Sequence, residues 1–278
     1  MPSKKLIAGV VVLLVVAVVL VLFVAPVVTS SPAAVLKIEQ GEVIVNDKQA
    51  SSGMILKEGD IIATGQNAKA SIVLYGASSV RLAENTLVEI AELSNGKFRL
   101  IQKSGATWNK VTKLSGFESY EIETPHAIAA TQGTTFGCRI VITSQLIDSF
   151  IQSHTECSVL DGSIGMTSEE DSTPIFAGQT GSAEKDSTKE DKILITDVGL
   201  NDTWIQENLA KDDQFIKDVK DRIRSKYAAY IPLIKSQYGL TDAQIDQMLS
   251  DFLSGKYSNE QYESALGQLK SKGIEIRL

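Results

Sequence analysis

The chain has 278 residues, of which 43% are hydrophobic and 22% charged, which is enough for one or two globular domains. Its formal net charge of -7 argues against the basic surface that nucleic-acid binding requires, so we predict no nucleic-acid partner. The acidic balance otherwise indicates solubility and says little about the fold.

An uncharged apolar run occupies Leu6–Val24. It has the length of a helix that crosses ~30 Å of hydrocarbon, where a helix satisfies its own backbone. Lys4 and Lys5 precede the run and are expected to stay cytoplasmic, so residues 1–5 would form a cytoplasmic stub. The bulk of the chain would then be exported, either to the periplasm or to the cell exterior. A cleaved signal peptide is the alternative; the run is longer than the usual 7–15 apolar residues, and Pro26 follows the most suitable cleavage site.

After a linker at residues 25–33 the hydrophobic period becomes two, which indicates half-buried strands. Asn95-Gly96 is expected to form the turn of a hairpin between Leu87–Leu93 and Lys97–Gln102. Many short strands favour a jelly-roll-like β sandwich over residues 34–180, with a β-solenoid as the alternative. The fold class is therefore mainly β, with a helical C-terminal part.

The stretch Glu121–Gly137 marks a corner between strands. Pro125 cannot donate to a central ladder, so it should open a strand or lie at an edge. Gly133 is expected to supply a bulge or a positive φ angle.

The same stretch contains TPHAIAATQGTTF, which resembles the signature of the FecR-like domain. Further parts of that pattern are Glu58-Gly59-Asp60 upstream and Cys157–Gly162 downstream, so the resemblance covers roughly residues 34–180. Gln132 stands where the family usually carries Arg. The resemblance implies the extracytoplasmic domain of an iron-transport regulator.

Few side chains suggest chemistry. His126 and His154 are the only histidines and make a poor zinc site without nearby cysteine pairs. We expect Asp60 to bond its own backbone in a turn, and Trp108 to pack in a core. No nucleophile elbow, P-loop or Rossmann fingerprint occurs, so we predict no enzyme, no metal and no cofactor. The carboxylates that could serve a glycan hydrolase, by residue type alone, are Glu84, Glu89 and Glu92.

Cys138 and Cys157 are the only cysteines. They lie in Thr134–Thr143 and Thr155–Val159, which could be neighbouring strands. In an oxidising compartment we expect a disulfide that closes a loop of about 20 residues and contributes roughly 3 kcal/mol. Two buried free thiols are the alternative.

A polar linker is expected at residues 181–195, followed by a helical region at 196–278. Capping boxes begin at Thr203, Thr241 and Ser258, and Pro232 should kink or end a helix. Asn201-Asp202-Thr203 is a formal glycosylation sequon that we interpret as a helix start. The apolar face after Thr241 could dock on the β domain, pack on other helices, or bind a partner. Its partner-binding candidates are Ile245, Leu249 and Phe252.

These features predict a membrane-anchored, exported, non-catalytic binding or scaffolding protein of the cell envelope. Its partner would be an envelope protein or a glycan, and its N-terminal helix would hold it in the membrane. The alternative is a component of a transmembrane signalling or transcription-regulating system. Residues 1–5 are too short to hold a sigma factor, so that role would require a membrane partner.

Overall fold

The computed structural model describes residues 32–94, 96–112, 115–143, 152–184, 192–226, 228–229 and 231–253. They belong to two compact units, a β unit of residues 32–210 and a helical unit whose described part begins at Lys211. The predicted membrane span Leu6–Val24 and the helix expected after Ser258 lie outside the described residues. Within the described ranges, no helix is long and apolar enough to cross a bilayer.

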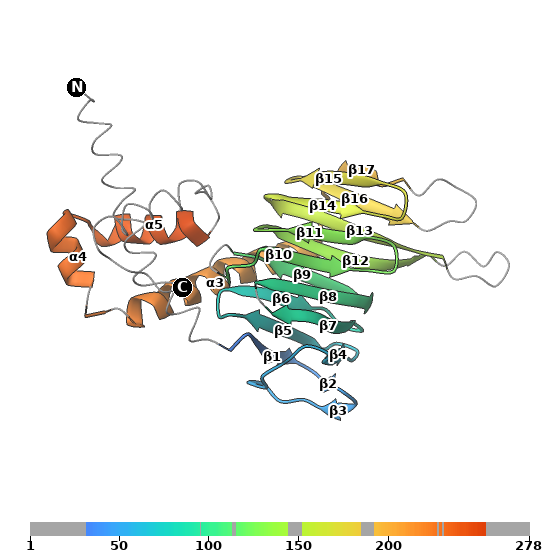
Figure 1. Ribbon diagram of the computed structural model, residues 1–278, viewed down its shortest axis with the longest axis horizontal. Helices are drawn as coiled ribbons and strands as arrows, with labels where there is room; N and C mark the ends of the chain where they lie inside the picture. The colour runs from blue at the N-terminus through green and yellow to red at the C-terminus, as the bar shows by residue number, and fades with distance from the viewer. Residues whose placement is uncertain are drawn as a thin grey trace, which may run out of the picture. The chain divides into compact units, whose positions relative to one another are not determined.

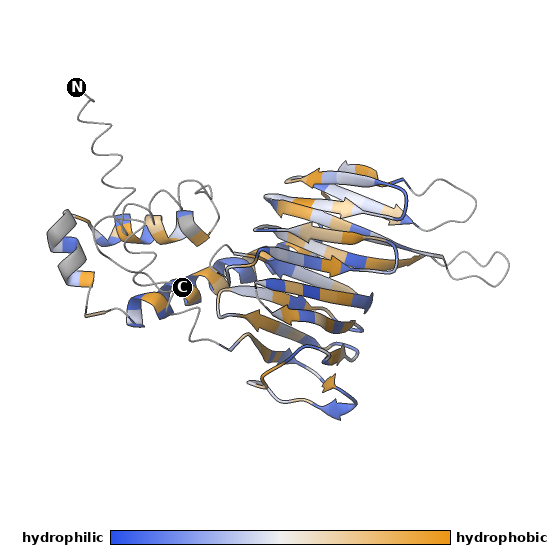
Figure 2. Cartoon of the chain, in the orientation of Figure 1, coloured by the Kyte–Doolittle hydropathy of each residue, from blue (hydrophilic) through white to orange (hydrophobic). Residues whose placement is uncertain are grey.

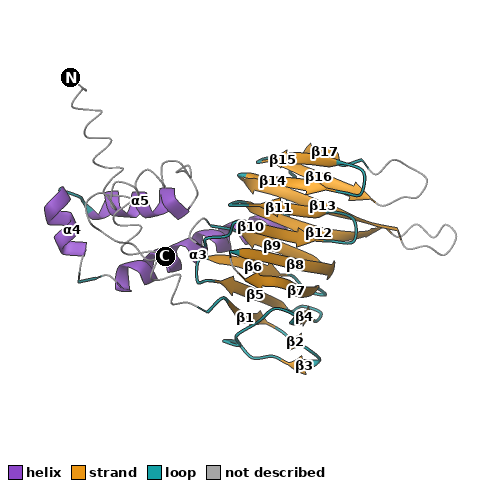
Figure 3. Cartoon of the chain, in the orientation of Figure 1, coloured by secondary structure: helices purple, strands orange, loops and turns teal. Residues whose placement is uncertain are grey.

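The β unit consists of two sheets (Figures 1 and 3). Sheet A has the order β1 (Ala34–Gln40), β5 (Lys69–Leu74), β6 (Ser78–Leu82), β9 (Ala106–Lys110), β12 (Thr135–Thr143), β13 (Gln152–Asp161), β16 (Gln179–Glu184) and β17 (Leu194–Asp197). Sheet B has the order β15 (Ser172–Phe176), β14 (Ser163–Thr167), β11 (Ile128–Thr131), β10 (Ser119–Glu123), β8 (Lys97–Ser104), β7 (Leu87–Ser94), β4 (Ile61–Thr64), β2 (Val43–Val45) and β3 (Lys48–Gln49).

The strand order confirms a sandwich-like pair of sheets and corrects the jelly-roll expectation. In sheet A the strand numbers only increase from one edge to the other, and sheet B departs from such an order only at β2 and β3. A jelly roll is built from Greek keys, in which a strand returns by a long connection to lie beside an earlier one. Here short connections carry the chain forward between the two sheets. The chain therefore advances as in the alternative solenoid, but its neighbouring strands are antiparallel except for β8 and β10.

The main core lies between the sheets and follows the predicted alternation. Val88, Ile90, Phe98 and Leu100 of sheet B join one buried cluster with residues of sheet A. Burial of each such side chain stabilises the fold by about 1.5–3 kcal/mol. The predicted hairpin is confirmed: β7 and β8 pair, and Gly96 has a φ of 77°.

A polar network also crosses this core. The Tyr120 hydroxyl donates to Asn109 Oδ1 at 2.7 Å, and both residues are fully buried. The Thr107 hydroxyl donates to Gln102 Oε1 at 2.8 Å, and Gln102 Nε2 donates to the Gly105 carbonyl at 2.9 Å. Burial raises the pKa of Tyr120 well above its ordinary value, so the hydroxyl stays protonated and can act as the donor. Partners on other strands thus satisfy these inward polar groups.

The signature corner is a hydrogen-bonded bend between β10 and β11. The Thr124 hydroxyl donates to the Ala127 carbonyl at 2.8 Å and accepts from the Ala127 N–H at 3.0 Å. Pro125 lies in this bend, where a missing N–H costs no ladder bond, and it opens no strand. Gly133 does not have a positive φ angle, and the nearest register shift lies between Thr135 and Phe136. Gly133 therefore supplies neither the positive φ nor the bulge that we predicted for it.

The β unit extends past the boundary expected at residue 180. The expected linker 181–195 contains the end of β16 and the start of β17, and the unit continues to Ala210. The sequence obscures this because Leu194–Asp197 is exposed throughout and shows no inward–outward alternation.

Up to Leu253, where the described residues end, three helices follow: α3 (Thr203–Lys226), α4 (Ile231–Tyr238) and α5 (Asp242–Leu253). Pro232 is the second residue of α4, so it begins a helix where we expected it to kink or end one. In the helical unit Val219 and Ile223 of α3 are buried, and Lys220 Nζ lies 2.7 Å from Ser250 Oγ and 3.6 Å from Asp246 Oδ2 of α5.

The predicted capping box at Thr241 is confirmed. The Gln244 N–H donates to Thr241 Oγ1 at 3.2 Å, and the Thr241 N–H donates to Gln244 Oε1 at 2.9 Å. We expect Thr241→Ala to destabilise the helical unit by about 1 kcal/mol, because the start of α5 loses a side-chain acceptor. Thermal melting followed by helical circular dichroism measures this, with Thr241→Ser as the matched control. Equal melting of both variants would show that the box does not stabilise the unit.

Candidate functional site

The most distinctive site of the β unit is the docking face, which we define as Trp108, Gly137 and Arg139 of sheet A with the start of α3 held against them. On β9 the side chains of Thr107 and Asn109 join the polar network inside the sandwich. Because neighbouring residues of a strand point to opposite faces, Trp108 points outward. It is nevertheless completely buried, because Val198 and Ile205 form a second small core with it.

The centre of the docking face is a close approach of two tryptophans. Trp108 and Trp204 meet edge to face, with ring centroids 5.3 Å apart and an interplanar angle of 84°. Gly137 lies beneath Trp204: a Cβ there would be 2.4 Å from Trp204 Cη2 and 2.9 Å from Trp108 Cε3. Only glycine leaves room for this arrangement. The prediction that Trp108 packs in a core is confirmed, but this is the small core with Val198 and Ile205 and not the main core between the sheets.

A charged pair completes the face. Arg139 Nη2 donates to Asp202 Oδ2 at 2.6 Å, and the guanidinium carbon lies 4.2 Å from the centroid of the Trp204 ring. Asp202 also caps α3, since its Oδ1 accepts from the Trp204 N–H at 2.8 Å. The helix start predicted around Asn201-Asp202-Thr203 is confirmed, but its cap is Asp202. The capping box predicted to begin at Thr203 is wrong, because Thr203 is the first residue of α3 and the Gln206 N–H donates to the Asp202 carbonyl.

Two contacts extend this attachment along α3. Arg81 is 8% exposed, and its Nη1 donates to the Asn208 carbonyl at 3.3 Å. Lys69 Nζ lies 3.1 Å from Glu207 Oε2, but both side chains are about half exposed. The apolar contacts and the Arg139–Asp202 pair therefore carry most of the attachment, because exposed pairs contribute little.

The Arg139–Asp202 pair makes the docking face sensitive to acid. Partial burial raises the pKa of Asp202, but the hydrogen bond and charge of Arg139 and the N–H groups of Trp204 and Ile205 outweigh it and lower the pKa. A lowered folded-state pKa adds stability above the unfolded value of about 3.9, and that stability is lost as the pH falls through the folded value.

We expect Asp202→Asn to lower stability at pH 7 by about 1 kcal/mol, because it removes the charge and retains a good cap. The difference between wild type and variant should shrink below about pH 4. Thermal melting at pH 7 and pH 3 measures this. A difference that stays constant with pH would mean that the carboxylate charge adds nothing.

The two histidines lie apart from the docking face, in separate hydrogen-bonding positions. His126 lies in the signature bend, with Nδ1 2.9 Å from Thr155 Oγ1 and Nε2 3.1 Å from Ser153 Oγ. The polar stretch Gln152-Ser153-His154 predicts an exposed turn. His154 lies instead on β13, with Nε2 3.1 Å from Glu156 Oε1, and its side chain is 22% exposed. Among the described residues, no three His, Cys, Asp or Glu side chains could share a metal ion.

The other predicted side chains have structural partners. Asp60 is 4% exposed, and its Oδ2 accepts from the Lys57 N–H at 2.9 Å, which confirms the turn interpretation. Of the candidate carboxylates, Glu89 pairs with Lys103 at 2.8 Å and Glu84 accepts from the Asn67 N–H at 2.6 Å.

Cys138 and Cys157 form a disulfide, as predicted. They are directly opposite on β12 and β13, their Cα atoms are 4.2 Å apart, and both side chains are buried. Cys138 belongs to the main core, while its neighbours Gly137 and Arg139 contact Trp204 on the other face. One strand therefore supplies both the disulfide and the docking face.

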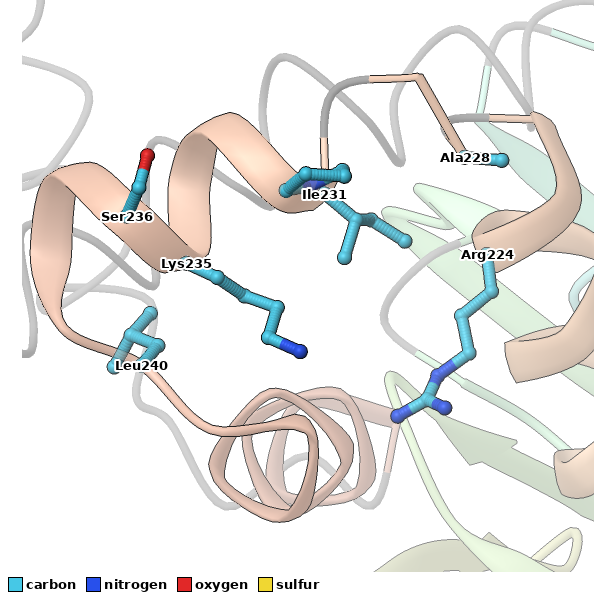
Figure 4. A pocket seen from close by; sticks show the side chains of 7 residues that line it. Arg224, Ala228, Ile231, Lys235, Ser236 and Leu240 are labelled. Carbon is cyan, nitrogen blue, oxygen red and sulfur yellow. The ribbon is translucent and has the colours of Figure 1, made fainter.

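The helical unit contains a separate open pocket of about 610 Å³ (Figure 4). Arg224 and Lys235 line it together with apolar side chains such as Ile231 and Leu240. Both cations already have acidic partners: Arg224 lies 3.2 Å from Asp246, and Lys235 lies 2.6 Å from Asp242. The Lys235 hydrogen bond and charge lower the pKa of Asp242, so that carboxylate stays ionised. Both described cations of the pocket are therefore paired with carboxylates, and this pairing identifies no ligand.

The predicted partner-binding face of α5 is partly described. Ile245 and Leu249 are 5% and 3% exposed, so they are packed in the structure. The side chain of Phe252 lies outside the described residues. A role for these three residues in partner binding stays a prediction.

The fold and the docking face define a sandwich-like β module that holds the start of a helix on its outer surface. Residues 60–165 match the family described as FecR protein, so this chain contains a FecR-like domain and the resemblance is confirmed. No curated protein matches the chain.

Two solved structures, both described as a "putative anti-sigma factor" from Parabacteroides distasonis ATCC 8503, are similar at 14% identity with a TM-score of 0.39. The similarity covers 49% of this chain and 59% of each of theirs.

Proposed function

We propose that this chain is a non-catalytic regulatory component of a transmembrane signalling system, with its FecR-like domain outside the cytoplasm. Support comes from the FecR match over residues 60–165. The buried disulfide is consistent with an oxidising compartment outside the cytoplasm. The predicted span Leu6–Val24, with Lys4 and Lys5 before it, would anchor the chain with its N-terminus inside.

The observation that carries the proposal is the continuity of α3. Its first residues are held on the docking face of the β unit, and from Lys211 the same helix belongs to the helical unit. A ligand that changes the docking face would change how the start of α3 is held, and a membrane partner that recognises this change would carry the signal. The proposed ligand class is an envelope protein, because the docking face is built from apolar contacts and a charged pair of the kind that protein partners recognise.

A deletion strain tests the regulatory role. We expect transcription of a defined gene set to change in the deletion strain and to be restored by the wild-type chain. A docking-face variant, Trp204→Ala, should restore it incompletely, whereas Gly165→Ala, which meets no atom within 4 Å, should restore it fully. Unchanged transcription, together with capture of an envelope protein or glycan by residues 31–278, would favour the scaffolding function instead.

Membrane topology needs its own test. Protease added to spheroplasts should degrade the chain after about Thr29 and leave only the predicted span and stub. Full protection of the C-terminal part would contradict the proposed export.

A further inference from the structure

We propose that β17 pairs with β17 of a second copy of this chain and so joins the A sheets of two molecules. A sheet edge exposes unpaired backbone groups, which natural proteins usually protect. The two sheets of the β unit have four edges, formed by β1, β17, β3 and β15. Three of these edges are protected, and the fourth, β17, has no strand or loop bonded to it among the residues that the structure describes.

The three protected edges are protected in three different ways. The outer edge of β1 is covered by a loop: the Leu36 N–H donates to the Met54 carbonyl at 2.8 Å, and the Leu56 N–H to the Ala34 carbonyl at 3.0 Å. Strand β3 is only two residues long, and one of them is a lysine. Strand β15 has Pro174 at its centre, which offers no N–H to a further strand.

Strand β17 has none of these devices. Within the described residues, it pairs with β16 on one side and with no strand on the other. Leu194 is 66% exposed and Ile195 is 45% exposed. An exposed apolar edge of this kind is a template for strand addition.

The register shows which backbone groups are open. The Val198 N–H donates to the Gly178 carbonyl at 2.8 Å, one position beyond the β16–β17 register. Hydrogen-bonded pairs alternate along an antiparallel ladder, so the backbone N–H and C=O groups of Leu194 and Thr196 also point toward β16. Ile195 and Asp197 therefore direct their N–H and C=O groups toward the open side.

The unpaired edge of β17 is short, because other bonds occupy the backbone just before and just after it. This favours an equally short partner strand. On its N-terminal side the Ile193 N–H already donates to Asp171 Oδ2 at 3.0 Å. On its C-terminal side the chain turns toward α3, with the Leu200 N–H bonded to the Val198 carbonyl at 2.9 Å. A second β17 has the same free length, whereas a longer strand would meet Asp171 at one end and the turn at the other.

A two-fold axis through Thr196 makes this edge complementary to itself. Ile195 would then pair with Asp197 of the second copy, and Asp197 with Ile195, so that every outward N–H and C=O of both residues is used. The edge strand β17 lies at the same end of the sandwich as β15 (Figures 1 and 2). On β15, Phe176 is 54% exposed and adds apolar surface, and its N–H donates to Oε1 of Gln179, which pairs with Asp197. The contact is small, so we expect a weak dimer that forms at high local concentration.

Cysteine cross-linking of the full chain in membranes tests the pairing. On the two-fold axis the two Thr196 residues would form a non-hydrogen-bonded pair, with Cα atoms about 4.5 Å apart, within disulfide range. Thr196→Cys should therefore give a covalent dimer on non-reducing gels after mild oxidation. The matched control is Thr167→Cys, because Thr167 is also an exposed strand residue but lies on β14, an interior strand of sheet B.

Blocking variants complete the test. Ile195→Pro removes an N–H that points away from β16, so it should reduce the Thr196→Cys dimer at least about tenfold without breaking the sandwich. Ile195→Lys keeps the N–H, places a charge on the edge, and should also reduce the dimer. The proposal is overturned if Thr196→Cys cross-links no more than Thr167→Cys, or if mass spectrometry finds a different protein in the adduct. It is equally overturned if both blocking variants fold and dimerise like the parent.

Discussion

Replacing Gly137 with Val should release the start of α3 from sheet A while the two sheets stay folded. A Cβ at residue 137 would come within 2.4 Å of Trp204 and 2.9 Å of Trp108. Trp108 is carried by β9, an interior strand of sheet A that is paired on both sides, so the end of the Trp204 side chain must move. The move breaks the edge-to-face contact and the Arg139 cation–π contact, and it exposes the small core around Val198 and Ile205. The loss should be about 3 kcal/mol, at the low end for removal of a packed tryptophan.

Intrinsic fluorescence reports this change directly, because the chain has only two tryptophans and both lie in the docking face. We expect the emission of Gly137→Val to shift to the red, and proteases to cleave residues 198–210 faster. The β-sheet circular dichroism should stay close to that of the wild type.

Gly165→Val is the matched control, since Gly165 also lies on a strand without a positive φ and a Cβ there meets no atom within 4 Å. Trp204→Ala should reproduce the protease sensitivity by another route. If Gly137→Val keeps the wild-type emission and protection, Gly137 does not control docking.

The sequence predicts those parts of the fold that depend on neighbouring residues. Alternation places Val88, Ile90, Phe98 and Leu100 inward because one face of each strand is buried. The turn at Gly96 and the capping box at Thr241 are likewise local features, and the structure confirms both. The Cys138–Cys157 bond follows from two strands that flank one loop.

Other parts depend on residues far apart in the chain, and local patterns do not reveal them. On β9 the polar residues Thr107 and Asn109 point inward and Trp108 outward, because Gln102 and Tyr120 satisfy the first two and α3 covers the third. A prediction from hydrophobicity alone would place Trp108 inside the sandwich and Thr107 and Asn109 on its outer face. The docking of α3 was missed for the same reason, and its one sequence signal was Gly137 two residues before Arg139 on an apolar strand.

The second large effect concerns the disulfide. We expect Cys138→Ala combined with Cys157→Ala to lower the free energy of unfolding by about 3 kcal/mol, because the bond closes a loop with a sequence separation of 19. For a domain of this size the melting temperature should fall by roughly 6–12 °C. Reduction of the wild-type protein should have a similar effect, and the oxidised protein should show no alkylatable thiol in mass spectrometry.

The position of the bond on β12 sharpens this prediction. Gly137, Cys138 and Arg139 are consecutive, so the disulfide fixes the strand whose outer face receives Trp204 and Asp202. Loss of the bond should therefore loosen the docking face in addition to the main core, and the tryptophan emission should shift red before the sheets melt. In Gly137→Val, by contrast, the emission should shift while the disulfide stays intact. If the double alanine variant melts in a single step, with no earlier change in tryptophan emission, the bond stabilises the sandwich as a whole and does not act through the docking face.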